Sequence, residues 1–172
     1  MSTAAAQLFV AVEAGIVYVR VAGRGTFASG VDFKALLEGV IRQGHKRIAV
    51  DLRDCPLMDS TFIGLLTTFG MQLPPLEGGG LSLHHVNDRI LGLLRNLGVA
   101  HLFLACNPGD GIPEHLAVRP ADSASASHAD LQRTCLEAHE KLMEANPENV
   151  ARFKDVTRFL AEDLKSAGAS PA

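Results

Sequence analysis

The sequence predicts an α/β fold, with a mixed, mostly parallel sheet of about five strands and helices packed on it. The first observation is a set of short runs in which apolar and polar residues alternate, the period of a strand. The second is a set of longer runs whose apolar residues recur at helical spacing. The third is that both kinds of run alternate after an opening pair of strands. That order favours helices crossing over between parallel strands.

The opening pair of strands is predicted at 8–13 and 16–23. Only a short turn containing Gly15 separates them, which is typical of a β-hairpin. In the second strand, valines alternate with Tyr18 and Arg20, so we expect one face of this strand to be covered.

Helices and strands alternate through the rest of the domain. A helix is predicted from the apolar spacing between Phe33 and Ile41, and a second helix begins near Ser60 and stops at Pro74. The other expected elements are strands at 47–52, 81–85 and 101–106 and a helix at 87–96. The strand at 101–106 is expected to complete the sheet.

The remaining chain divides into a linker and a pair of helices. Residues 107–127 are rich in Pro, Gly, Ser and Ala, which indicates a linker between a domain at 1–106 and a tail at 128–172. Two apolar stripes separated by Pro147 predict a helical hairpin in this tail. A lone hairpin cannot cover such stripes. We therefore expect it to dock on its own domain or, slightly favoured, to form a homodimer with a second copy.

Composition narrows the function classes. The 172-residue chain carries a net charge of −3, which argues against a nucleic-acid-binding protein. No run approaches the ~18 apolar residues of a membrane span, and the first residues lack the basic and apolar regions of a signal peptide. Three cysteines form no pair with metal-ligand spacing, so we expect a cytoplasmic protein with no cofactor or metal.

The candidate site is the turn Asp59-Ser60-Thr61, which follows a buried strand and opens a helix. The first turn of a helix has unpaired N–H groups and a positive dipole end. A phosphate on Ser60 would therefore be stabilised there. The simpler interpretation is that the three residues only cap the helix, and both remain open at this point.

The segment around this turn resembles the core of the STAS domain, the fold of bacterial anti-sigma factor antagonists. The match runs from Met58 through Thr61, with Gly64 at the motif's second glycine and Phe62 where the family usually has glycine. Residues 19–23, within the second strand, and residues 87–99 are also similar to the family. The resemblance covers about the first 106 residues.

The resemblance implies a non-enzymatic signalling module. Unphosphorylated protein would bind an anti-sigma factor of the serine-kinase type and so free a sigma factor. Ser60 would be the phosphoacceptor, with Asp59, Thr61 and Phe62 as partner-binding residues. Phosphorylation would add about −1.5 to −2 charges and disrupt that interface. The kinase would bring ATP and Mg²⁺, and this chain would hold no cofactor.

Phe62 has a second interpretation, as a core residue, because aromatic side chains are often buried. The function also has alternatives. One is a non-phosphorylated scaffold or regulatory subunit of a signalling assembly or of the ATPase of a lipid-transport system, which Phe62 favours.

Another alternative is a small-ligand carrier or enzyme that uses the loops near Ser60. It lacks support from the sequence, because no histidine lies near Ser60 in the chain and no G-x-S-x-G elbow is present. His84 and His85 are neighbours on a predicted strand. They should therefore point to opposite faces rather than bind one metal ion.

Overall fold

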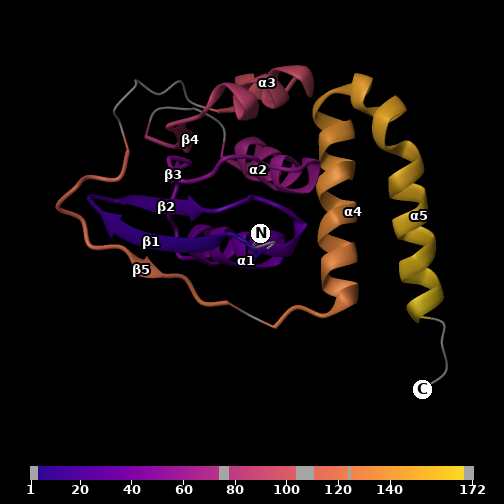
Figure 1. The fold of residues 1–172 in the computed structure, drawn as a ribbon, viewed down its shortest axis with the longest axis horizontal. Helices are drawn as coiled ribbons and strands as arrows, with labels where there is room; N and C mark the ends of the chain where they lie inside the picture. Colours follow the sequence, from indigo (N-terminus) through magenta and orange to yellow (C-terminus); the bar gives the residue numbers. More distant parts are fainter. Residues whose placement is uncertain (1–3, 74–77, 104–110, 124, 169–172) are drawn as a thin grey trace.

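The computed structural model describes residues 4–73, 78–103, 111–123 and 125–168. Its sheet has five strands in the order β4-β3-β2-β1-β5 (Figure 1). They are β1 (Gln7–Glu13), β2 (Ile16–Ala22), β3 (Arg47–Asp51), β4 (Gly80–His84) and β5 (Arg119–Pro120). Strand β1 is antiparallel to both of its neighbours, whereas β2, β3 and β4 run parallel. The predicted mixed sheet is confirmed, with parallel pairing confined to these three strands.

The fifth strand is not where the sequence predicted it. Within the predicted strand at 101–106, the described residues begin in a 3-10 helix, η1 (Ala100–Leu102), and residues 104–106 lie outside the described ranges. The fifth strand comes instead from the predicted linker, where Arg119 and Pro120 pair with β1. It lies at the edge of the sheet, where a proline can be tolerated. Ile112, also in the predicted linker, is buried, so part of this segment packs on the domain.

One face of the sheet carries the core. Helices α1 (Phe27–Arg42), α2 (Ser60–Gln72) and α3 (Asp88–Asn96) supply its helical side. The strands contribute inward-facing valines, isoleucine and leucines, among them Val17, Val19, Val50, Ile48 and Leu81. Helix α2 is buried on nearly every side, including Thr61 and Gly64 as well as the residues that face the sheet. A helix buried all round needs a cover on its outer side.

The C-terminal hairpin provides that cover. It consists of α4 (His128–Ala145), a short 3-10 turn η2 (Pro147–Asn149) and α5 (Val150–Gly168). Figure 1 shows α4 lying against the domain and α5 outermost, and α4 contacts both α1 and α2. The hairpin is confirmed, and it docks on its own domain. The homodimer stays a prediction.

The two predicted apolar stripes differ in how far they are buried. On α4, Ala138 and Leu142 are fully buried. On α5, Phe153, Leu160 and Leu164 of the stripe are half-buried, whereas Val150 and Val156 are exposed, as is Phe159 beside the stripe. A second copy is therefore not needed to cover α4.

A buried amide fixes the turn of the hairpin to the domain. The side-chain NH₂ of Asn149 donates to the carbonyls of Leu97 and Leu142, both at 2.9 Å. Asn146 also donates to the Leu97 carbonyl, at 3.2 Å. The end of α3 and the end of α4 are thereby held together through one acceptor.

Gly64 permits the close crossing of α2 and α4. A Cβ atom at this position would lie 2.4 Å from the carbonyl oxygen of Ala138. No side chain fits in that space, so the second glycine of the motif has a packing role in this protein.

We predict that Gly64→Ala destabilises the protein by about 1–3 kcal/mol, because overpacking outweighs the better helix propensity of alanine. Gly92→Ala is the matched control, since Gly92 is inside α3 with no atom within 4 Å of the added carbon. It should stabilise by up to about 1 kcal/mol. Urea unfolding of both variants measures the difference, and equal stabilisation would contradict the close crossing.

Candidate functional site

The turn before α2 is held by a neighbouring loop. The backbone of Gly25 donates to the Leu57 carbonyl at 3.0 Å, and Asp59 N–H donates to the Gly25 carbonyl at 3.0 Å. Gly25 and Met58 thus form a parallel bridge next to the sheet. This bridge fixes where Ser60 begins the helix.

Asp59 is the N-cap of α2. Its Oδ1 accepts from the N–H of Phe62 at 2.9 Å, and its Oδ2 accepts from the N–H of Phe27 at 2.8 Å. Phe27 is the first residue of α1, so a single carboxylate caps one helix and ties it to the start of another. The capping interpretation is therefore correct for Asp59, and Ser60 is left free of that task.

The Ser60 hydroxyl meets a histidine that lies far away in the sequence. Its Oγ is 2.9 Å from Nε2 of His139, which is on α4 and only 5% exposed. Nδ1 of His139 is 2.7 Å from the carbonyl oxygen of Cys135. A carbonyl only accepts, so Nδ1 carries a hydrogen. Nε2 then accepts from Ser60 when the ring is neutral and donates to it when the ring is protonated.

Thr61 makes the adjacent contact with α4. Its Oγ1 lies 3.3 Å from the sulfur of Cys135, and that sulfur is 3.5 Å from Nδ1 of His139. Thr61 is only 4% exposed. Ser60 and Thr61, two of the predicted site residues, are thus both bonded to the hairpin.

The environment shifts the pKa values of two side chains at this contact, His139 and Cys135. Burial alone would lower the pKa of His139, but its bonds to the thiol and carbonyl of Cys135 and the nearby Asp59 carboxylate together raise that pKa. Burial also disfavours the thiolate of Cys135, yet bonds to His139 and Thr61 outweigh it and lower the pKa of the thiol. A protonated imidazole beside Ser60 is therefore favoured.

Phe62 lies in the core of the domain. Its side chain is fully buried, and its ring centroid is 4.6 Å from that of Phe33 on α1. This burial favours the core interpretation of Phe62, and a partner-binding role at this position stays a prediction. Phe62 precedes the buried Phe69 by seven residues, a spacing that places both rings on one helix face.

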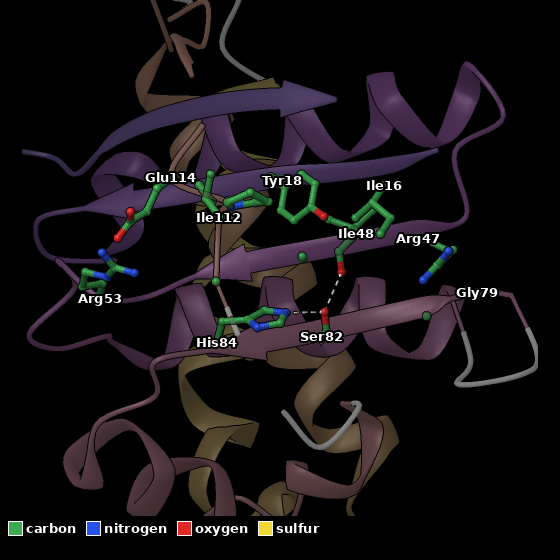
Figure 2. A pocket seen from close by; sticks show the side chains of 14 residues that line it. Ile16, Tyr18, Arg47, Ile48, Arg53, Gly79, Ser82, His84, Ile112 and Glu114 are labelled. Atoms are coloured by element: carbon green, nitrogen blue, oxygen red, sulfur yellow. Dashed lines mark hydrogen bonds between the residues drawn. The ribbon is translucent and has the colours of Figure 1, made fainter. Parts of the chain in front are cut away.

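Ser60 and His139 have the spacing of a nucleophile and its base, and the Cys135 carbonyl orients the ring, but a protonated ring cannot accept the hydroxyl proton. The hollow in Figure 2, of about 480 Å³, lies elsewhere. Tyr18, Ser82 and His84 line this hollow. They alternate along their strands with core residues, so the hollow opens on the face of the sheet opposite to the one that the helices cover. The alternative of a small-ligand site in the loops near Ser60 gains no support from this hollow.

The adjacent histidines have different partners, but not through strand alternation, because β4 ends at His84 and His85 has a positive φ of 55°. His84 Nε2 is 2.8 Å from the Ser82 hydroxyl, whereas His85 Nδ1 is 3.0 Å from the buried Asp51. Across the described ranges, no group of three or more His, Cys, Asp or Glu is placed to hold a metal ion.

We predict that His139 stabilises the fold more at low pH. Its pKa is higher in the folded protein than the unfolded value of about 6.5. Its stabilising contribution is therefore complete below that pH and is lost as pH rises through the folded pKa. In urea unfolding, the stability difference between wild type and His139→Gln should shrink between about pH 5.5 and about pH 8.

His101→Gln, which removes an exposed imidazole in η1, is the control for that measurement. A His139→Gln difference that stays constant over the same range would contradict the raised pKa.

In the described part of the chain, no helix is both long and apolar enough to cross a bilayer. No curated protein matches the chain. Solved structures that match include the anti-sigma factor antagonist SpoIIAA in its unphosphorylated form, 19% identical with a TM-score of 0.46 over 52% of this chain and 81% of that one. Another is the Bacillus cell fate determinant SpoIIAA in its phosphorylated form, 18% identical with a TM-score of 0.48 over 59% of this chain and 91% of that one.

The family comparison covers the sheet domain. Residues 3–105 match the family model described as Mlab, STAS domain, which is more than half of the 172-residue chain. That stretch includes strands β1 to β4, the turn at Asp59 and Ser60, and helices α1 to α3. The hairpin that covers Ser60 lies beyond it. The chain therefore belongs to the STAS domain family.

Proposed function

We propose that this protein is a non-enzymatic regulatory module that binds a protein partner at the start of α2 and is switched by phosphorylation of Ser60. The observation that carries the proposal is the Ser60 hydroxyl, which projects from the first turn of a helix whose cap is made by Asp59 instead. The helix dipole at that position favours an added phosphate.

The proposed partner is an anti-sigma factor of the serine-kinase type, as the family resemblance implies. Binding of unphosphorylated protein would free a sigma factor and so regulate transcription in the cytoplasm. The kinase supplies ATP and Mg²⁺ and transfers the phosphoryl group to Ser60. Asp59 and the surface around it are then the contact region, with Thr61 available only when α4 is displaced.

His139 gives the phosphate a defined counter-charge. The raised pKa of its imidazole favours the protonated form, and its Nε2 already lies 2.9 Å from the Ser60 oxygen. An anion at Ser60 would attract that ring and strengthen the docking of α4. Phosphorylation would therefore disfavour partner binding in two ways, through repulsion of the partner and through a more firmly seated hairpin.

A second candidate is a regulatory subunit of a larger complex, such as a signalling assembly or a transport ATPase, that is never phosphorylated. Two observations favour it. Phe62 fills the core at the position where the family usually has glycine, and the hairpin covers the hydroxyl of Ser60.

We predict that Ser60→Ala still binds the partner and takes up no phosphate, whereas Ser60→Asp binds about tenfold more weakly or worse, since like charges at an interface are unfavourable. Partners are captured from the native cell with each variant, and intact mass after incubation with the captured kinase reports phosphorylation. Ser125→Asp adds the same charge at an exposed position and should bind normally. Equal binding by all variants, with no phosphate on the wild type, would favour the second candidate.

A further inference from the structure

The surface beneath α4 is a groove between two helices. We call it the α1–α2 groove, and it is formed by Gly30, Lys34, Ser60, Thr61, Gly64 and Leu65. A Cβ atom on Gly30 would lie 3.1 Å from Leu65 and 3.6 Å from the methyl group of Thr134 on α4. The added carbon at Gly64 would collide with the backbone of Ala138. Gly64 therefore makes a notch that only a helix with a small residue at the crossing can enter, whereas Gly30 is tight only against Leu65 of α2.

Polar groups flank this notch and complement the helix that fills it. Lys34 on α1 pairs with Glu137, and Ser60 on α2 bonds to His139. Between these residues lies Ala138, the one that enters the notch. Glu137, Ala138 and His139 of α4 thus contact Lys34, Gly64 and Ser60 in turn. This pattern indicates the side chains that a helix needs in order to fit the groove.

The docking contact of α4 is more polar than the core of the domain. Its fully or nearly buried side chains are Thr134, Ala138, His139 and Leu142, two polar and only one of them large and aliphatic. The Lys34–Glu137 pair is partly exposed, and such pairs add little to stability. A surface unit that is held partly by polar contacts can open locally without unfolding the rest.

We propose that the α1–α2 groove is the binding surface for an amphipathic helix of the partner, and that α4 occupies it in cis as an intramolecular competitor. The partner helix carries a small residue at the crossing, with an acidic residue and a hydrogen-bonding residue beside it. Ser60 and Thr61 become accessible only when the hairpin leaves. The identity of the partner rests on the proposed function, whereas the exchange of helices rests on the groove alone.

Because α4 occupies the groove, it lowers the apparent affinity of the groove for a helix from another molecule. The apparent dissociation constant equals the intrinsic value divided by the fraction of molecules whose groove is open. A substitution in α4 that loosens the hairpin should therefore tighten binding, although it lies outside the groove.

The experiment uses the full-length protein and a fluorescein-labelled peptide of residues 127–168 as the helix probe. Ala138→Arg in the full-length protein should bind this peptide about tenfold or more tightly than the wild type, because its own α4 no longer fits the notch. Ala151→Arg, on the exposed side of α5, is the matched control and should bind as the wild type does. A peptide that itself carries Ala138→Arg should not bind.

A second variant closes the groove covalently. The Oγ1 of Thr61 is 3.3 Å from the Cys135 sulfur, so Thr61→Cys places two thiols side by side. In a Cys106→Ser background, oxidation with glutathione disulfide should lock α4 in place and abolish peptide binding. Reduction with dithiothreitol should restore it.

Locked protein that binds the peptide as tightly as reduced protein would overturn the proposal. So would Ala138→Arg protein that folds but binds no more tightly than the wild type. If Ala138→Arg does not fold, the Thr61→Cys comparison decides alone. No kinase or phosphate enters these measurements, so a failure here is distinct from a failure of the Ser60 switch.

Discussion

The rest of the site depends on the crossing of α4 over the first turns of α2. Gly64 lets the two backbones approach until no added carbon would fit, and Ala138 fills the remaining space. That approach brings His139 within hydrogen-bonding distance of Ser60 and Cys135 within reach of Thr61. Without the glycine, the helices would stand further apart and the hydroxyl groups at the start of α2 would face solvent.

Asp59 caps the N-terminus of α2, which leaves the Ser60 hydroxyl free to contact α4. Serine and aspartate are both good caps, and a cap must point its side chain back at the backbone. Because Asp59 satisfies the N–H groups of Phe62 and Phe27, the neighbouring hydroxyl can point outward to α4. The same carboxylate contributes to the raised pKa of His139, so the cap of α2 also influences the charge of the ring beside Ser60.

Local pattern was enough to predict the strands and helices whose residues face one core. Alternating valines marked β2, and the spacing of apolar residues marked α1 and the hairpin. The fifth strand escaped prediction because β5 has two residues and contains a proline, which leaves no alternation to detect. The role of Phe62 was open to prediction, since it lies seven residues before Phe69 on the same helix face.

The contact between Ser60 and His139 could not be predicted, because it joins residues 79 positions apart and depends on where the hairpin docks. The stripe on α4 showed that the helix would be buried but carried no information on its site. The sequence alone therefore suggested a phosphoacceptor turn, whereas the position of α4 over that turn could be seen only in the tertiary structure. In this protein the start of α2 and the helix that covers it belong to one chain.

Hydrogen exchange of the full-length protein tests the central claim, a hairpin that is docked yet detachable, most directly. The account predicts that amides of α4 between residues 131 and 142 exchange as one cooperative unit, well protected but less so than those of β2 and β3. Two results would contradict it. Unprotected exchange would mean that α4 does not cover Ser60, and protection equal to that of the central strands would mean that it cannot leave without global unfolding.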